Sequence, residues 1–528
     1  MQNLPIGTQS FSILRDTNCL YVDKTQHIYN MTEQGRVYFL SRPRRFGKSL
    51  LISTLEELFN GNKKLFEGLF IYDKWNWDIK YPVIRLDFGQ RSYNTAEDLR
   101  ISLTDFVNAK AKEFDIVLDT TGLSDRFGEL IEKLNAKTGQ RVVMLIDEYD
   151  KAMTDFMSDP AKASANRTEL HNFYQVLKAA DKHLQFIFLT GVSKFSGVSV
   201  FSALNNPNDL TLDKRYSASC GYTHEELETN FADYINGTAD ALGKTKTELL
   251  DSIQTWYNGY TWDGITKVYN PFSTLMLFDK QEFSNYWIKT GASISTEMLL
   301  EDNDLLETLF NEKNIVDYKF FDGFDLNKIK GKSFLFQTGY LTIKNINRIG
   351  DEREYFLEIP NKEVRASLMQ YMLSAYSDID EDNLSPIARD IKIQIKNLDA
   401  KGLEKNLRIL FAKIPFKLYI NREAYYHSIF LLIMIFLEFE IQGEVATNLG
   451  AIDALWKQPD INVVIEIKHS LQKTQKVLLK EAMNQIKEKK YYEPYMDKPV
   501  LLLAIAFTAG SNKNRLTEIS CKFEKLPQ

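Results

Sequence analysis

Two stretches of the sequence place phosphate-binding and metal-binding residue types in a familiar order. The first, RPRRFGKS, ends in Gly47, Lys48 and Ser49. In a loop before a helix, the glycine permits a close turn, the lysine ammonium reaches the outer phosphates of a nucleotide, and the serine hydroxyl binds Mg²⁺. The second, VVMLIDEYD, delivers Asp147 and Glu148 at the end of an apolar run. Its first carboxylate suits Mg²⁺ and its second suits the attacking water, so the two stretches together predict an NTP-hydrolysing site.

A third stretch combines two carboxylates with a lysine. Asp453 alternates with apolar neighbours in NLGAIDALW, and Glu466 and Lys468 are two apart in VVIEIKHS. On a strand that spacing puts both side chains on one face, and neighbouring strands would bring the two carboxylates to one Mg²⁺ or Mn²⁺. Such a metal polarises a phosphodiester and activates a bound water, while the lysine stabilises developing charge. The pattern is also common on solvent-facing strands, so spacing alone leaves both interpretations open.

The NTP residues require strands that end beside the start of a helix. Short apolar runs predict strands at 37–40, 82–88, 141–147 and 184–191, and recurring leucines after Gly47 predict a helix to about Asn60. Strands that alternate with helices indicate a parallel sheet covered on both faces. At the end of the last of these strands, Thr190 or Ser193 could touch the γ-phosphate, although an ordinary strand-end turn explains them equally well.

The rest of the chain shows two further patterns. After about Lys214, charged helical segments, aromatic-rich turns and the hairpin-like pair SFLFQTGYLTIK and REYFLEIP predict a helical or winged-helix region. From about Arg422, a helix, three strands, a helix and a strand follow in the order αβββαβ, and the second and third strands carry the two carboxylates. The expected class is therefore α/β at both ends of the chain.

Several motifs resemble those of a known family. YVDKT, SRPRRFGKSL, LIDEYD, LTGVSKFS, LNNPNDLT, WYNGY and YNPFS resemble the AAA-ATPase-like proteins common in gut bacteria, whose P-loop core is similar to the AAA+ and STAND groups. The family's own loop reads RPRRFGKS, which implies that Arg42, in place of the usual first glycine, is a family trait. The resemblance implies ATP as the nucleotide. Arg42, Arg44 or Arg45 could add transition-state charge, and we place Arg45 in the nucleotide site, with a solvated basic loop as the alternative.

The C-terminal sequence resembles the PD-(D/E)XK nuclease domain that this ATPase family carries. The resemblance rests on REAYYHSIF, GEVATNLGAIDALW, VVIEIKHS and EAMNQIKEKKYYEPY in the order given above. It implies that Asp453, Glu466 and Lys468 are the signature acidic pair and lysine.

Four further positions follow from the same resemblance. Glu444 and Gln485 fall at accessory positions, the first as an acid behind the metal ligands and the second as a contact to metal-bound water or phosphate. A plain surface role stays open for both. His427 also matches, although a lone histidine on a buried helix is more often a satisfied core residue. Ala451 departs from the arginine usual before ID, which puts a backbone contact or local packing in doubt.

Composition limits the partners of the chain. Its 528 residues exceed one ordinary core, and a net charge of −6 argues against a whole-surface field for nucleic acid. Any DNA binding must therefore use a local patch, and from 468 to 490 seven lysines face two glutamates, although a solvated helix face explains them as well. Three scattered cysteines favour a reducing cytoplasm. The apolar run IFLLIMIFL is too short to cross a bilayer and predicts a buried helix.

These observations predict three domains. We expect an AAA-like P-loop ATPase at 1–215, a helical or winged-helix lid with connecting helices at 216–410, and a PD-(D/E)XK nuclease-like domain at 411–528. We expect ATP and Mg²⁺ as cofactors, Mn²⁺ as a substitute at the nuclease site, and DNA as the partner of the C-terminal domain, with no membrane partner; a homo-oligomer is compatible with the sequence. The alternative is a STAND-like NTPase switch whose C-terminal domain binds nucleic acid or protein without cutting it. Degenerate sites on an interaction scaffold are disfavoured because both residue sets are intact.

Overall fold

The chain folds into two compact units, which we call unit 1, Met1–Ser293 with Ile315–Val364, and unit 2, Ile294–Asn314 with Arg365–Gln528. The structure is a computed structural model. It describes residues 2–90, 93–157, 159–195, 204, 207–287, 314–323, 331–350, 352–368, 384–412, 423–436, 439, 441–447, 450–509 and 517–526. The expected domain boundaries after 215 and 410 stay a prediction.

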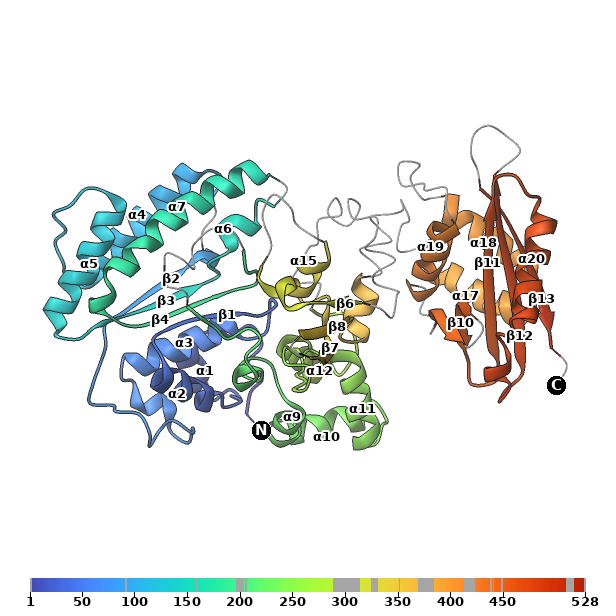
Figure 1. Ribbon diagram of the computed structural model, residues 1–528. Coiled ribbons are helices and arrows are strands. Elements are labelled where there is room, and N and C mark those ends of the chain that lie inside the picture. Colours follow the sequence, from blue (N-terminus) through green and yellow to red (C-terminus); the bar gives the residue numbers. More distant parts are fainter. Residues whose placement is uncertain are drawn as a thin grey trace. The chain divides into compact units, whose positions relative to one another are not determined.

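Unit 1 is built on a five-stranded sheet in the order β2-β3-β4-β1-β5, in which every neighbouring pair is parallel (Figure 1). The strands are β1 (Val37–Ser41), β2 (Val83–Asp87), β3 (Val142–Asp147), β4 (Leu184–Gly191) and β5 (Asn208–Asp209). Every residue of β3 is buried, as expected for a strand covered on both faces. Because β4 lies between β1 and β3, the carboxyl ends of all three strands meet at one edge of the sheet.

Helices cover both faces of this sheet (Figure 1). One side carries α4 (Ala96–Glu113), α5 (Leu123–Thr138) and α7 (Pro160–Ala179), and the other carries α1 (Phe11–Asp16), α2 (Thr25–Gln34) and α3 (Lys48–Phe59). The short helix α6 (Lys151–Thr154) follows β3. Helix α3 buries Leu51, Ile52, Leu55, Leu58 and Phe59, a helical spacing that packs it against the sheet. The expected parallel α/β fold is confirmed.

A helical subregion of unit 1 follows the sheet. It comprises α9 (His224–Asn230), α10 (Ala232–Ala241), α11 (Lys246–Tyr257) and α12 (Pro271–Lys280). Helices α9 and α11 each begin with a capping box, and α12 begins with an Asn270 cap and proline at its first position. The apolar core of these helices also contains Leu20 and Val22 from the N-terminal segment. Residues more than 200 positions apart in the chain thus share one core.

A small antiparallel sheet completes unit 1. Its order is β6-β8-β7, with β6 (Ile315–Val316), β7 (Thr342–Ile349) and β8 (Glu352–Glu358). The expected hairpin is present as β7 and β8, but SFLFQT, assigned above to its first strand, belongs to helix α15 (Gly331–Thr338). A short run of buried residues has no periodicity that separates helix from strand, which explains the error. Gly339, at φ 94, follows this helix.

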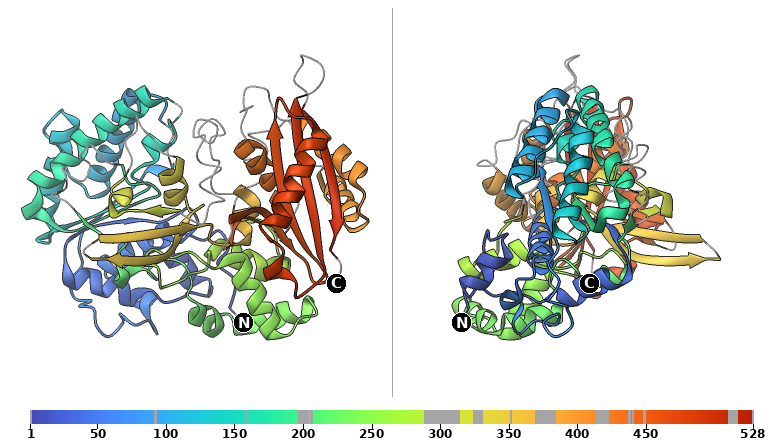
Figure 2. Two further views of the ribbon diagram at one scale, coloured as in Figure 1. Left: turned by 45° about the vertical axis from the view of Figure 1, so that its right-hand side comes forward. Right: turned by 90° about the vertical axis from the view of Figure 1, so that its left-hand side faces the viewer.

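Unit 2 contains a five-stranded sheet in the order β13-β12-β11-β10-β9, parallel only between β11 and β12. The strands are β9 (Ile441–Thr447), β10 (Gly450–Lys457), β11 (Asn462–Ser470), β12 (Val500–Ala509) and β13 (Thr517–Lys525). Figures 1 and 2 show α20 (Gln475–Glu488) on one face, with α17 (Leu384–Lys396), α18 (Ala400–Ala412) and α19 (Glu423–Phe436) on the other. The order αβββαβ is confirmed; β13 is an additional strand that the sequence did not predict.

Helix α19 contains most of the apolar run that predicted a buried helix. Among its described side chains, six are at most 1% exposed: Tyr426, Ile429, Phe430, Leu431, Ile433 and Met434. Across the described residues, no helix combines the length and apolar character that a membrane crossing requires.

Candidate functional sites

The phosphate loop joins β1 to α3 at the edge where the strands end. Gly47 caps α3 with φ 94, a left-handed conformation that glycine adopts without strain. The Lys48 ammonium is buried and donates to the carbonyls of Arg42, at 2.9 Å, and Pro43, at 3.0 Å. An ammonium has three donors, so one is left for a phosphate oxygen. Burial lowers the pKa of Lys48, against the opposing charges of nearby carboxylates, so a bound anion would favour the charged lysine.

Arg42 occupies the position of the missing first glycine, but its side chain does not face the cavity beside the loop. It is fully buried, stacks 3.9 Å over the ring of Trp262, and donates to the carbonyls of Thr211 and Tyr216. Burial lowers its pKa to about 10. The expectation that Arg42 could add charge to the phosphates is therefore wrong: its contacts tie the loop to the chain that follows the sheet.

Arg45 has a different environment. It is exposed, lines the cavity beside the loop, and lies with its guanidinium 5.3 Å from the ring centre of Phe272. Its φ of 69 is unusual for a residue with a side chain, and such conformations concentrate at functional sites. Of the three arginines, Arg44 and Arg45 line the cavity.

Carboxylates from two adjacent strands meet opposite the loop. Asp147 ends β3, is 1% exposed, and pairs in register with Asp87 at the end of β2. Burial raises the pKa of Asp147, whereas a hydrogen bond from Ser49 and the charge of Lys48 lower it. The structure thus brings Lys48, Ser49 and Asp147 together. Asp87, which lines the cavity, had no predicted role; its place at a strand end was the signal that could have found it.

Glu148 also lines the cavity and has a left-handed backbone, at φ 52. Its carboxylate lies against Gly89: a Cβ built there would be 2.8 Å from Glu148 Oε2 and 3.0 Å from Asp87 Oδ1. Gly89 is therefore the residue whose lack of a side chain leaves room for this carboxylate.

The last two residues of the DEYD motif fasten β3 to β4. Tyr149 donates its backbone N–H to Thr190 O, and Asp150 accepts backbone N–H groups from Val192 and Ser193 at 3.1 and 2.7 Å. Burial raises the pKa of Asp150 to about 6. The hydroxyls of Thr190 and Ser193 are buried without a hydrogen-bond partner in the described structure, and neither residue lines the cavity.

The cavity has a volume of about 500 Å³ and lies within unit 1. It is lined by residues from five parts of the chain that are distant in sequence: the N-terminal segment, the phosphate loop, the end of β2, the end of β3, and the helical subregion with the residues just before α9. Its apolar lining includes Leu20, Val22, Tyr222, Pro271, Phe272 and Leu275. YVDKT and YNPFS carried only a resemblance at the sequence level, and the structure now places residues of both at the cavity.

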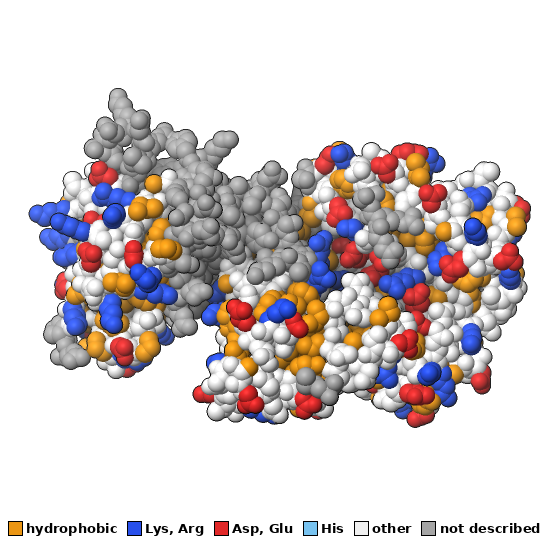
Figure 3. Space-filling model, turned by 180° about the vertical axis from the view of Figure 1, so that it is seen from behind, with side chains coloured by type: hydrophobic (Ala, Val, Ile, Leu, Met, Phe, Trp, Pro, Cys, Tyr) orange, Lys and Arg blue, Asp and Glu red, His pale blue; other side chains and the backbone are white. Residues whose placement is uncertain are grey.

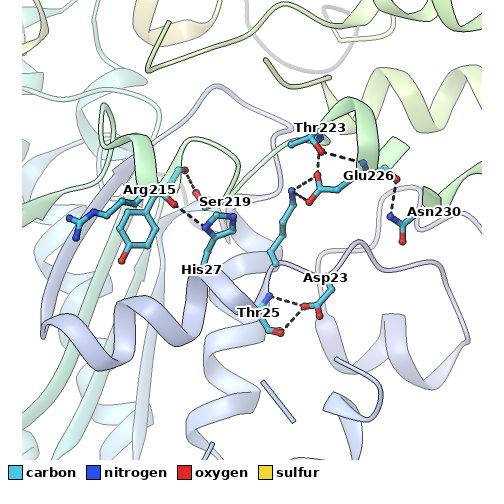
Figure 4. A network of polar contacts seen from close by, with 10 residues as sticks. Asp23, Thr25, His27, Arg215, Ser219, Thr223, Glu226 and Asn230 are labelled. Carbon is cyan, nitrogen blue, oxygen red and sulfur yellow. Dashed lines mark hydrogen bonds and ion pairs between the residues drawn. The ribbon is translucent and has the colours of Figure 1, made fainter. Parts of the chain in front are cut away.

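A partly buried ion pair joins the N-terminal segment to the helical subregion beside this cavity (Figure 4). The Lys24 ammonium lies 2.6 Å from both carboxylate oxygens of Glu226. Glu226 is also the third residue of the α9 capping box, where it accepts the backbone N–H of Thr223. On the same segment, His27 contacts the Arg215 carbonyl (Figure 4). One glutamate therefore links the start of α9 to a lysine that lines the cavity.

The second candidate site lies on β10 and β11 of unit 2. The two strands are antiparallel neighbours, with Leu455 opposite Val464. Asp453 and Glu466 lie two residues beyond this pair, so both are on the face where α20 packs against Leu455 and Val464. The expected placement on one face of neighbouring strands is confirmed.

Hydrogen bonds fix these side chains. Asp453 Oδ2 accepts the backbone N–H of Ile467 at 2.7 Å, and the Lys468 ammonium lies 3.1 Å from Glu466 Oε1. Glu466 is fully buried, and its Oε2 has no hydrogen-bond partner in the described structure. Burial raises the pKa of Asp453; burial and the nearby Asp453 carboxylate raise that of Glu466. Although burial disfavours the Lys468 ammonium, the surrounding carboxylates outweigh it and raise the pKa of this lysine.

Comparison with known proteins identifies a family for each end of the chain. The family described as "Predicted AAA-ATPase" matches residues 5–201, and the PD-(D/E)XK nuclease superfamily matches residues 421–517. An uncharacterized protein in the vnfD 5' region of Azotobacter chroococcum mcd 1 is 37% identical over 518 residues, which is 97% of each chain.

The chain is an AAA-ATPase-like protein with a C-terminal PD-(D/E)XK domain.

The PD-(D/E)XK domain holds a third carboxylate that the sequence did not single out. Glu423, in the first turn of α19, lies with Oε1 3.2 Å from the Lys468 ammonium and accepts the His469 backbone N–H through Oε2. His427, one turn later, contacts the Asp453 carbonyl through Nε2 at 2.5 Å, which requires the proton on that nitrogen. The spacing of four between Glu423 and His427 was the available signal.

The accessory positions are less closely tied to this site. In the strand register Glu444 falls opposite Asp453, because its neighbours Val445 and Gly443 pair with Ile452 and Ala454, but its side chain lies outside the described residues. Gln485 is half-buried on α20, and among described residues no hydrogen bond joins it to Asp453, Glu466 or Lys468. Ala451 is exposed.

The lysines of the PD-(D/E)XK domain are partly neutralised. Besides Lys468, three of the seven are in ion pairs, Lys473 with Glu481, Lys487 with Glu524 and Lys490 with Glu493. The remaining three, Lys476, Lys480 and Lys489, are exposed and have no ion-pair partner among the described residues. Figure 3 shows basic and acidic side chains interspersed on the visible face of this unit. A uniform cationic surface is not present there.

Proposed function

We propose that this AAA-ATPase-like protein binds and hydrolyses ATP in the cavity of unit 1 and cleaves DNA with a metal-dependent site in its PD-(D/E)XK domain. The observation that carries the nuclease part is the buried carboxylate of Glu466, whose Oε1 faces Lys468 while its Oε2 has no hydrogen-bond partner among the described residues. A buried carboxylate oxygen without a hydrogen-bond partner costs folding free energy unless it binds a proton or a cation. A divalent cation would bind at this oxygen.

Hard oxygen ligands suit Mg²⁺ or Mn²⁺, and the residues present fit such an ion. Asp453 and Glu466 would hold it. Among described residues no group of three or more metal-binding side chains is found, so waters and substrate oxygens would complete the coordination. When bound, the ion supplies Lewis-acid polarisation of the phosphodiester and an acidified water.

The protein's own groups would do the rest of the nuclease chemistry. Lys468, charged at neutral pH because carboxylates surround it, would stabilise the negative charge that develops on the phosphate. Glu423 and Glu466 hold its ammonium from two sides and so restrict where it points. His427 donates to the Asp453 carbonyl, which holds the middle of β10 in place.

In the ATPase site each residue would act on a different part of the nucleotide. Lys48 would bind the outer phosphates with its remaining donor, and the unpaired N–H groups at the start of α3 would add to this. Ser49 and Asp147 would hold Mg²⁺, which offsets phosphate charge when bound. Glu148 would orient and deprotonate the attacking water, and Arg45 would stay near the phosphates. The apolar lining of the cavity suits the base. Thr190, which does not line the cavity, would act on the nucleotide site only by packing within β4.

The proposed substrate is DNA, reached through exposed lysines of α20 such as Lys476 and Lys480. The three cysteines are free and buried, in keeping with the expected reducing cytoplasm. Oligomer formation stays a prediction.

One assay tests the proposal. Full-length protein is incubated with supercoiled plasmid and with linear single-stranded and double-stranded DNA, in Mg²⁺ or Mn²⁺, with and without ATP. We expect nicked or shortened products that require the metal and disappear with EDTA, and ATP hydrolysis in the same samples. Intact DNA in every condition, from protein that hydrolyses ATP, would contradict the nuclease assignment and leave the ATPase assignment standing.

A further inference from the structure

The back of the phosphate loop packs on a region of unit 1 that the chemistry above does not use. We call residues 315–364 the hairpin module; its described part contains α15, β7 and β8. Gly339, between α15 and β7, has φ 94, and a Cβ there would lie 2.7 Å from two side-chain atoms of Pro43. Module and loop therefore meet at a point where no side chain fits between them.

A hydrogen-bonded chain extends this contact. The indole N–H of Trp287, a fully buried residue, donates to the Arg44 carbonyl at 3.0 Å. The Trp287 backbone N–H donates to Glu363 Oε1 at 2.8 Å, and Glu363, fully buried in the module, also accepts the Ser273 hydroxyl. The module thus holds the tryptophan that holds the loop.

A second contact grips the segment that follows β4. Gln337 of α15 accepts the Lys194 backbone N–H at 2.9 Å and donates to the Lys194 carbonyl at 3.4 Å. The Gln337 amide thus exchanges two hydrogen bonds with the Lys194 backbone, as a residue of a neighbouring strand does. Lys194 comes directly after Val192 and Ser193, whose backbone N–H groups donate to Asp150 of the DEYD motif. Gln337 therefore reaches the same edge of the sheet by a different route.

Nucleotide binding would disturb the phosphate loop next to Arg44, whose carbonyl accepts the Trp287 indole N–H. Lys48 donates to the carbonyls of Arg42 and Pro43, next to the Arg44 carbonyl that Trp287 holds. When the Lys48 ammonium turns its remaining donor toward a phosphate, its two bonds to these carbonyls change in length, and the loop shifts against the module. A cavity of about 20 Å³ lined by Arg42, Pro43, Lys194 and Gln337 among others leaves room for a small shift.

We propose that Trp287 and Gln337 are positioning residues through which the hairpin module responds to the nucleotide bound in the cavity. In the chain, the module is bounded by two of the three positions at which unit 1 and unit 2 alternate, before Ile315 and after Val364. The inference rests on the proposed nucleotide site.

Hydrogen exchange of the full-length chain tests the proposal, with Mg²⁺ and a non-hydrolysable ATP analogue. The variants are Gln337→Met, which keeps the volume and loses both hydrogen bonds, and Trp287→Phe, which keeps a ring and loses the donor to Arg44. Asn347→Ala, an exposed amide on β7, is the matched control. Analogue affinity is measured for wild type and every variant, and kcat and KM for ATP report the positioning role.

We expect the analogue to slow exchange in peptides covering 331–349 and 352–364 by about twofold or more in wild type and Asn347→Ala. In Gln337→Met and Trp287→Phe the change should fall to less than about half, with analogue affinity within roughly threefold of wild type and a lowered kcat at little-changed KM. Gln337→Glu, which keeps the acceptor for Lys194 N–H, should restore part of the change. If one variant does not fold, the other decides.

Two results overturn the proposal. The first is a full exchange response in both variants; the second is no response in the module of a wild-type protein that binds the analogue, and either leaves the nucleotide site intact. A wild-type protein that binds no analogue overturns the nucleotide site as well, so the two failures are separated by the affinity measurement.

Discussion

The nucleotide cavity of unit 1 and the carboxylate site of unit 2 are prepared for ligands of opposite charge. In the cavity, the buried Lys48 ammonium donates to two carbonyls, and no described residue takes its third donor. In the carboxylate site, one oxygen of the buried Glu466 carboxylate has no hydrogen-bond partner among the described residues. Burial disfavours the charged form of both groups, lowering the lysine pKa and raising the glutamate pKa. Each site therefore gains most from the ligand it lacks: an anion in the first and a cation in the second.

The sites also differ in how the chain assembles them. The carboxylate site needs two adjacent strands and the first turn of α19, all within about 50 residues of sequence. The cavity needs five segments spread from the N-terminus to α12. A cavity built from distant segments can change shape when they move, whereas a site on paired strands is rigid. We infer that regulation is a property of the first site and steady chemistry a property of the second.

The largest expected effect is the loss of DNA cleavage when the carboxylate site of unit 2 is changed. Asp453→Asn removes one of two carboxylates for the cation and should lower DNA cleavage by roughly 1,000-fold, to background. ATP hydrolysis should stay close to wild type because the cavity lies within unit 1. Plasmid nicking and phosphate release are measured on the same preparation. Asp460→Asn, exposed at the turn after β10, is the control and should cut normally; equal cutting by both variants would remove Asp453 from the site.

The second prediction concerns ATP hydrolysis in the cavity of unit 1. Glu148→Gln keeps the shape of the side chain and loses the base, so ATP should still bind while hydrolysis slows by roughly 100-fold. Equilibrium binding of a fluorescent ATP analogue and steady-state phosphate release separate the two effects. Glu33→Gln, exposed on α2, is the control. Hydrolysis at the wild-type rate would assign the water to another group.

A third prediction concerns the joint between distant segments. Glu226→Ala removes both the partner of Lys24 and the capping-box acceptor of α9, and should lower the free energy of unfolding by about 2 kcal/mol. Urea denaturation of the full-length chain, followed by circular dichroism, gives this value. Glu225→Ala in the same first turn is exposed and should cost clearly less. Similar losses for both glutamates would mean that Lys24 and Glu226 do not stabilise the cavity wall.

The smallest expected effect is on kcat for ATP and tests whether the position of the Glu148 carboxylate matters. In Gly89→Ala the new Cβ would lie 2.8 Å from Glu148 Oε2, so the carboxylate must turn aside. We expect kcat for ATP to fall by roughly 10-fold with KM little changed. Gly237→Ala, where a Cβ would meet nothing within 4 Å, controls for the added methyl group. An unchanged kcat would show that Glu148 tolerates displacement.

Local patterns were sufficient to predict much of the fold and of both residue sets. The four long parallel strands and the αβββαβ order followed from apolar runs, because burial on both faces leaves continuous hydrophobic stretches. Asp453, Glu466 and Lys468 are near one another as expected, since a spacing of two on neighbouring strands fixes their face.

Other features depended on contacts that no local pattern carries. The position of Arg42 in its loop predicts a phosphate ligand. Its guanidinium instead stacks on Trp262, some 220 positions later in the chain, and does not line the cavity. Lys24 and Glu226 form a pair only after the N-terminal segment folds onto α9. Helix α15 is too short to show its period, whereas β13 alternates polar and apolar residues, a period-2 signal that our sequence-based prediction did not use.

Titration with Mn²⁺, followed by electron paramagnetic resonance, tests the central claim that the two sites take opposite ligands. We predict that full-length protein binds one Mn²⁺ without nucleotide, that Asp453→Asn loses this ion, and that ADP or an ATP analogue adds a second ion in both proteins. The same nucleotide-free Mn²⁺ signal in wild type and Asp453→Asn, or no second ion on adding nucleotide, would contradict the account.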